Sequence, residues 1–224
     1  MRWEFLAQYL PLLAQATLLT TALSLISFAI GLSIGLLIAL SRLLGGRDTN
    51  AVLGAAVDLT RGTPLLVQLL AWYLGTSVLG FGLSPFIAAL IGLSVNASAF
   101  ISEILRGAIH AVPRGQREAA LAVGLTARFS ILRIELPQAL PAIVPALIGF
   151  FIGLVKDTSL AYILGLYELT RTAKLIADRE FRPLEIYLVI ALIYFMLCFP
   201  LSRVARLVDR RLQRSGLAQE RLSL

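Results

Sequence analysis

Cysteine and histidine are almost missing from this chain. Of its 224 residues, one is a cysteine (Cys198) and one is a histidine (His110). A lone cysteine cannot form a disulfide or a cysteine-based metal site within one chain. No cluster of metal ligands and no redox pair stands out elsewhere in the sequence. We therefore expect neither a metal nor a cofactor bound to this chain.

Charge is also scarce. Charged residues make up 15% of the sequence and hydrophobic residues 58%, and the mean hydropathy is +0.84. A soluble domain of this length needs more polar surface than this composition supplies. The composition therefore predicts an all-α integral membrane protein.

Lysine occurs only at Lys156 and Lys174, so arginine supplies most of the 20 cationic side chains and the formal net charge of +7. These arginines lie between apolar runs. That distribution is typical of the positive-inside bias of membrane proteins. It argues against a basic nucleic-acid-binding face, so no nucleic-acid partner is expected.

A phosphate-binding G-x-x-x-x-G-K-[ST] loop is absent from the sequence, so the chain is not expected to hydrolyse ATP by itself. Gly31-Leu32-Ser33-Ile34-Gly35 spells the G-x-S-x-G of a hydrolase, but it lies inside an apolar run with the one histidine far away. Gly31 with Gly35, and Gly149 with Gly153, also fit GxxxG, a pattern of closely packed membrane helices. We expect helix packing at both places and no enzyme activity.

Apolar runs of the length that crosses about 30 Å of hydrocarbon predict five membrane-spanning helices in one transmembrane domain, residues 1–224. We place them near 15–40, 63–80, 84–105, 138–163 and 185–203. Residues 51–62 are apolar enough to extend the second span, and Gly62 and Pro64 are then expected to break or kink it.

The cationic residues fall unequally on the two sides of these spans. Five lie on one side: Arg2, Arg171, Lys174, Arg179 and Arg182. Fourteen lie on the other side: Arg42, Arg47, Arg61, Arg106, Arg114, Arg117, Arg128, Arg133, Arg203, Arg206, Arg210, Arg211, Arg214 and Arg221. The larger set predicts the cytoplasmic side, which puts the N-terminus outside and the C-terminus inside.

The longest polar interruption of the apolar pattern, residues 113–137, is here called the elbow. Residues 118–123 favour a helix, Gly124 provides a stop that can turn left-handed, and Thr126 is a good cap for a second short helix over 129–135. Ala120 and Gly124 give one helix face a shallow notch. On these features alone the elbow is either a connecting loop with helical turns or a docking element.

The elbow also carries a motif. Glu118-Ala119-Ala120 is followed after three residues by Gly124, after nine more by Ile134, and after one more by Leu136-Pro137. This spacing resembles the EAA motif of ABC-importer permeases. The resemblance implies a type I importer permease fold, in which the cytoplasmic loop 106–137 carries the coupling helix that docks in a separate ATPase. It assigns ATPase coupling to Arg117, Glu118, Ala119, Ala120, Gly124, Leu136 and Pro137.

Three further stretches, 61–69, 99–116 and 155–160, resemble one branch of these permeases, the importers of polar amino acids (His, Glu, Gln, Arg and opines). This similarity implies ATP-driven uptake by alternating access across a bacterial cytoplasmic membrane. It also implies three partners: ATPase subunits that bind ATP and Mg, a second permease subunit, and a solute-binding protein. The rival interpretation is a secondary transporter or channel subunit driven by an ion gradient, for which inverted repeats are expected.

Polar residues within predicted spans are costly and therefore mark candidate sites. Those selected as a substrate pathway are Gln68, Asn96, Ser98, Lys156, Asp157 and Thr158. Asp157 would accept a hydrogen bond from a substrate ammonium. The alternatives are interhelical hydrogen bonds for the amides and hydroxyls, and extension of Lys156 to the membrane interface.

Three other charged regions have simpler interpretations. Glu103 is expected to pair with Arg106, three residues on. The segment 166–184 is expected to be a solvated charged loop, in a position to meet a solute-binding protein. Arginines between 203 and 214 are expected to anchor the last segment to anionic lipid.

Overall fold

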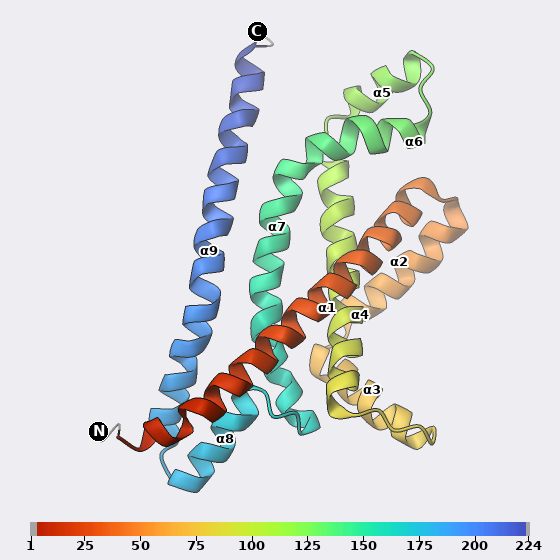
Figure 1. Ribbon diagram of the computed structural model, residues 1–224. Helices are drawn as coiled ribbons and strands as arrows, with labels where there is room; N and C mark the ends of the chain where they lie inside the picture. The colour runs from red at the N-terminus through yellow and green to blue at the C-terminus, as the bar shows by residue number, and fades with distance from the viewer. Residues whose placement is uncertain (1–3, 223–224) are drawn as a thin grey trace. The chain divides into compact units, whose positions relative to one another are not determined.

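The structure is a computed structural model that describes residues 4–222, with side chains from 6 to 211. Arg2 lies outside the described residues, and the side chains of Arg214 and Arg221 are likewise not described. In the described part, every regular element is helical (Figure 1). The elements are η1 (Glu4–Tyr9), α1 (Leu10–Leu44), α2 (Arg47–Gly62), α3 (Leu65–Val78), α4 (Pro85–His110), α5 (Arg114–Ala122), α6 (Ala127–Phe129), η2 (Ser130–Glu135), α7 (Leu136–Asp157), η3 (Thr158–Leu164), α8 (Leu169–Glu180) and α9 (Pro183–Leu222).

Long apolar runs produce the long helices, because a backbone in hydrocarbon must satisfy its own hydrogen bonds. Four stretches of the described chain are long and apolar enough to cross a membrane: Leu6–Leu44, Pro85–His110, Ala127–Leu164 and Pro183–Arg211. They coincide with four of the five predicted spans. The span predicted at 63–80 is the shorter apolar helix α3, whose 14 residues extend about 21 Å.

Glycine and proline divide the chain where the sequence predicts. Helix α2 ends at Gly62 and α3 begins at Leu65, with Pro64 in an extended conformation between them. Pro64 has no N–H to continue the hydrogen-bonding of a helix, and Gly62 disfavours a helix interior. The predicted break is confirmed.

The chain forms two compact units, and α1, α4, α7 and α9 each contribute to both. Unit 1 comprises the chain up to Gly31 together with Thr63–Ala97 and Phe151–Pro200. Its core joins η1, the first part of α1, α8 and the first part of α9 through nine buried hydrophobic residues: Tyr9, Leu13, Ala16, Leu169, Ala173, Ile176, Ala177, Ile186 and Ile190.

Helix α8 lies in the segment 166–184, where a solvated loop was expected, so that expectation is wrong. Leu169, Ala173 and Ile176 lie at i, i+4 and i+7, which gives one buried apolar face. The opposite face carries the charges, including Lys174 and Asp178, whose side chains pair at 2.8 Å. The many charges concealed this amphipathic pattern.

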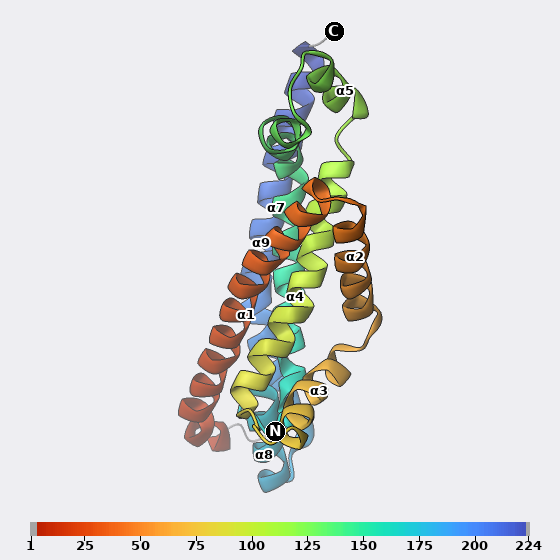
Figure 2. The ribbon, with the colours of Figure 1, turned by 90° about the vertical axis from the view of Figure 1, so that its right-hand side faces the viewer.

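Unit 2 comprises Leu32–Gly62, Ser98–Phe150 and the chain from Leu201. It contains the second halves of α1 and α4, all of α2, and the elbow. Both views show α5 beside the segment that leads into α7 (Figures 1 and 2).

Close helix packing, expected at both glycine pairs, occurs at one of them. A Cβ on Gly31 would lie 2.6 Å from the Cβ of Ala97 in unit 1, and one on Gly35 would lie 2.8 Å from the carbonyl oxygen of Ser98 in unit 2. Small residues therefore let α1 approach α4 in both units. At Gly149 and Gly153 an added Cβ meets no atom within 4 Å. Within the described chain these two glycines make no such close approach, so close packing at this pair stays a prediction.

Candidate functional site

The elbow is built from locally determined helix ends. Helix α5 stops at Gly124, which has a φ of +84° as predicted. The N–H of Leu125 donates to the carbonyl of Ala120 (3.1 Å) and that of Gly124 to Leu121 (3.0 Å), the paired bonds of a Schellman motif. Thr126 then caps α6 by accepting from the N–H of Phe129 at 3.3 Å. Both predicted signals are confirmed.

After α6 the chain differs from the predicted short helix over 129–135. Ser130–Glu135 forms a π-helix, η2, that runs directly into α7. Pro137 has no N–H to donate to the carbonyl of Arg133, so the α-helical hydrogen-bonding pattern cannot continue there unchanged. A local widening of the helix accommodates that loss.

Helix α5 packs against η2 and joins the two arms of the elbow. Ala120 is buried where α5 packs against η2, whereas Gly124, the other residue of the predicted notch, is exposed and an added Cβ there meets no atom within 4 Å. Glu135 is also buried; it accepts a hydrogen bond from the Ser130 hydroxyl at 2.9 Å, and Arg117 lies 3.9 Å away. These contacts make the elbow an internally braced projection.

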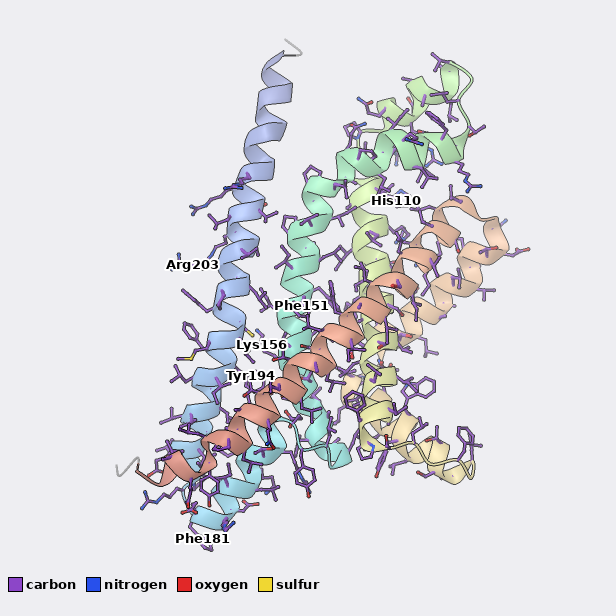
Figure 3. The ribbon with its side chains drawn as sticks, in the orientation of Figure 1. His110, Phe151, Lys156, Phe181, Tyr194 and Arg203 are labelled. Carbon is purple, nitrogen blue, oxygen red and sulfur yellow. The ribbon has the colours of Figure 1, made fainter. Side chains whose placement is uncertain are left out.

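The outer surface of the elbow is apolar at three exposed positions. Leu121 is 47%, Val123 75% and Phe129 46% exposed. Exposed large hydrophobic residues on a braced projection are typical of a contact surface. His110 lies at the end of α4, where the chain leads into the elbow (Figure 3). A concave site of about 360 Å³ lies here, and its walls include His110, Arg114, Glu118 and Leu121.

The structure separates the predicted coupling residues into two groups. Glu118, Ala119, Gly124 and Pro137 are exposed, and Leu136 is partly buried. Ala120 is buried in the elbow, and the partly exposed Arg117 lies 3.9 Å from the buried Glu135. Sequence analysis missed Val123 and Phe129, which present the most accessible apolar surface beside Leu121.

Two of the predicted pathway residues meet directly. In unit 1, Asn96 donates from its side-chain amide to Oε1 of Gln68 at 3.3 Å, joining α4 to α3. The Gln68 amide donates in turn to the carbonyl and the hydroxyl of Thr63, both at 3.0 Å. This is the interhelical bonding that the alternative interpretation predicts. Ser98 is buried in α4 in unit 2.

The other three pathway residues are consecutive at the junction of α7 and η3. Lys156, labelled in Figure 3, is exposed. Asp157 is partly buried. Thr158 is fully buried, and its hydroxyl donates to the carbonyl of Val155 at 2.7 Å. Of these three, Lys156 and Asp157 present charge at an accessible surface, whereas Thr158 caps the helix end.

A buried carboxylate that sequence analysis overlooked begins α8. Glu168 is fully buried and accepts from the N–H groups of Thr170 (2.9 Å) and Arg171 (2.7 Å), and Tyr194 of α9 lies 3.4 Å from its Oε2. Burial raises the pKa of Glu168 to about 7. Glutamate directly before a helical run was the available signal, but glutamate is not a preferred N-cap residue.

Membrane-length apolar helices joined to a braced, exposed elbow define an integral membrane component. A family model described as "Binding-protein-dependent transport system inner membrane component" matches residues 31–214. The chain belongs to this family, so the resemblance read from the EAA spacing is confirmed.

Two relatives match nearly end to end. The L-cystine transport system permease protein TcyB of Bacillus subtilis is 39% identical over 214 residues, covering 95% of this chain and 92% of the relative. The glutamine transport system permease protein GlnP of Escherichia coli is 36% identical over 213 residues, covering 94% of this chain and 97% of the relative.

Solved structures agree with the fold. A crystal structure of an amino acid ABC transporter with histidines matches with a TM-score of 0.89 and 34% identity, covering 94% of this chain and 99% of that one. A methionine ABC transporter, MetNI, in an inward-facing conformation matches with a TM-score of 0.74 at 22% identity, which supports the fold alone. The fold is that of a type I ABC-importer permease.

Proposed function

We propose that this chain is the permease subunit of an ATP-driven importer that moves a polar amino acid across the cytoplasmic membrane by alternating access. ATP and Mg bind a separate ATPase, which supplies the catalysis. A second permease subunit completes the pathway, and a solute-binding protein delivers the substrate. The family match and the amino-acid relatives support this assignment.

The elbow is the element on which the coupling proposal depends. A docking element must transmit displacement, so it must be rigid and must have an outer surface that binds the ATPase. The Schellman turn at Gly124 and the buried Glu135 provide the rigidity. The exposed Leu121, Val123 and Phe129 provide apolar surface, and the concave site at the base of α5 can receive a side chain of the ATPase.

Substrate contact is proposed at Asp157, with Lys156 beside it. An amino acid carries an ammonium and a carboxylate, and these two side chains offer the complementary charges at adjacent positions. Gln68 and Asn96 already bond each other, so we assign them to a polar wall that shapes the pathway. Ser98 and Thr158 are buried and support their helices.

The test replaces the exposed Val123 by arginine. Val123 is 75% exposed, so the permease should fold normally, whereas a cation placed in an apolar contact is left without a partner. We expect the ATPase to co-purify poorly and ATP-dependent uptake in proteoliposomes to fall at least about tenfold. Glu118→Lys should act in the same direction, because Glu118 is also exposed on α5.

Val52→Arg provides the matched control, since Val52 is similarly exposed on α2, away from the elbow sequence. Unchanged co-purification and uptake in both elbow variants would refute the docking role. ATP depletion separates the rival function: uptake that persists without ATP but collapses with the membrane potential would indicate an ion-gradient-driven transporter.

A further inference from the structure

The carboxylate of Glu103 on α4 gathers three arginines from three helices of unit 2. Its Oε1 accepts from Nη1 of Arg42 on α1 at 2.5 Å and from Nε of Arg106 on α4 at 3.0 Å, and its Oε2 accepts from Nη2 of Arg106 at 2.7 Å. Arg61, at the end of α2, lies 3.7 Å away. The predicted pair with Arg106 is confirmed, and two further cations join it.

Arg42 on α1 contacts both of the other helices in this cluster, α4 and α2. Its side chain is 9% exposed, and it donates from Nε to the side-chain oxygen of Asn50 on α2 at 3.2 Å. A Cβ on Gly54 would lie 3.2 Å from its guanidinium. The absence of a side chain at Gly54 therefore leaves room for Arg42 to pass along α2 and reach Glu103.

The cluster extends to α7 through aromatic rings. The Arg61 guanidinium lies over the ring of Phe100, 5.3 Å from its centroid. Phe100 in turn stacks on Phe150 of α7 with centroids 5.8 Å apart. These contacts tie α4 and α7 to each other and to α2.

Two of the helices joined in this way, α4 and α7, carry the elbow. Helix α4 ends at His110, and α5 begins at Arg114 after only three residues; η2 runs into α7 on the other side. A displacement of the elbow therefore acts first on α4 and α7. Only a stiff connection passes that displacement to α1 and α2.

We propose that Glu103 is a positioning residue that clamps α1, α2 and α4 so that they move with the elbow as one lever. The carboxylate is essential because it is the shared acceptor. Without its charge, the three guanidinium groups repel one another and the helices lose their common attachment. This inference rests on the proposed function for its transport readout, but the clamp itself is measurable without any ATPase.

The first measurement concerns the clamp alone. In a Cys198→Ala background, spin labels are placed at Val52 on α2 and Gln116 on α5, both exposed. We expect a narrow distance distribution for the wild-type cluster and a broader one for Glu103→Gln, with the permease in detergent and no ATPase present. An equally narrow distribution in the variant would overturn the clamp.

The second measurement is the number of substrate molecules imported per ATP hydrolysed by the intact complex. We expect Glu103→Gln to retain the ATPase on co-purification but to lower this ratio by about tenfold. Asp48→Asn, which removes an exposed carboxylate at the start of α2 outside the Glu103 cluster, should leave the ratio unchanged. A wild-type ratio in Glu103→Gln would overturn the proposal.

Arg42→Gln covers the case in which Glu103→Gln does not yield a folded complex. It removes the α1 attachment and leaves Glu103 paired with Arg106, so a smaller change in the same direction is expected in both measurements. No change in either would overturn the proposal. If the docking proposal is wrong, Val123→Arg will leave ATPase association intact. The spin-label measurement needs no ATPase, so it still tests the clamp in that case.

Discussion

At the scale of single residues, burial affects the pKa of Glu168 more than the hydrogen bonds to its carboxylate do. Two backbone N–H groups and Tyr194 favour the ionised form, yet desolvation is larger and raises the pKa to about 7. In the unfolded chain this carboxyl ionises near 4.5. Between these values the unfolded state binds fewer protons than the folded state, so stability falls as the pH rises.

This difference predicts a pH-dependent free energy of unfolding. The contribution of Glu168 is fully present below pH 4.5 and is lost as the pH rises to about 7, a change of roughly 3 kcal/mol. Glu168→Gln keeps an oxygen that can accept from Thr170 and Arg171 but does not titrate. Relative to Glu168→Gln, the wild-type protein should therefore lose stability across this range. Unfolding curves of both proteins in detergent at pH 5 to 8 measure this loss of stability. Equal pH slopes for the two proteins would contradict a raised pKa at Glu168.

The polar residues also show where the sequence was insufficient. Gln68 and Asn96 were identified as candidates, but their mutual bond joins positions 28 residues apart. Hydropathy and spacing describe one helix at a time and carry no information on which face meets another helix. The choice between substrate contact and helix–helix bonding therefore could not be made from the sequence.

At the scale of elements, two glycines in apolar helices have opposite environments. A Cβ on Gly35 would lie 2.8 Å from a carbonyl oxygen of α4, whereas one on Gly75 meets nothing within 4 Å. Gly35→Ala should force α1 away from α4 and destabilise the permease by about 1–3 kcal/mol. Gly75→Ala should be neutral or stabilising by up to about 1 kcal/mol, because alanine favours a helix.

Thermal unfolding of the two variants side by side measures this difference. The chemical change is identical, so helix propensity cancels in the comparison and only the environment differs. Equal stabilities would show that α1 and α4 do not pack closely at Gly35. The sequence identified the GxxxG pattern at Gly31 and Gly35, but the same pattern at Gly149 and Gly153 makes no such contact within the described chain.

At the scale of the whole molecule, the predicted orientation places the elbow and the α8–α9 connection on opposite sides of the membrane. Single cysteines in a Cys198→Ala background test this: one replaces Val123 in the elbow and one replaces Phe181, which is 90% exposed. An impermeant thiol reagent should label position 181 in intact cells, and position 123 only in inverted vesicles. Labelling of position 123 from outside would refute the orientation and, with it, the docking role.

The sequence by itself determined the class of protein and most of its helices. Hydrophobic run length, the break at Gly62 and Pro64, the left-handed Gly124 and the Thr126 cap are local properties, because neighbouring residues set hydropathy and backbone conformation. The EAA spacing indicated the family by its resemblance to a known motif, and the family match confirmed it. Only the tertiary structure decided that Glu103 gathers Arg42 and Arg61, that Ala120 is covered by η2, and that Glu168 is buried beside Tyr194. These contacts join distant segments, and their energies depend on desolvation and close approach, which exist only once the helices have packed.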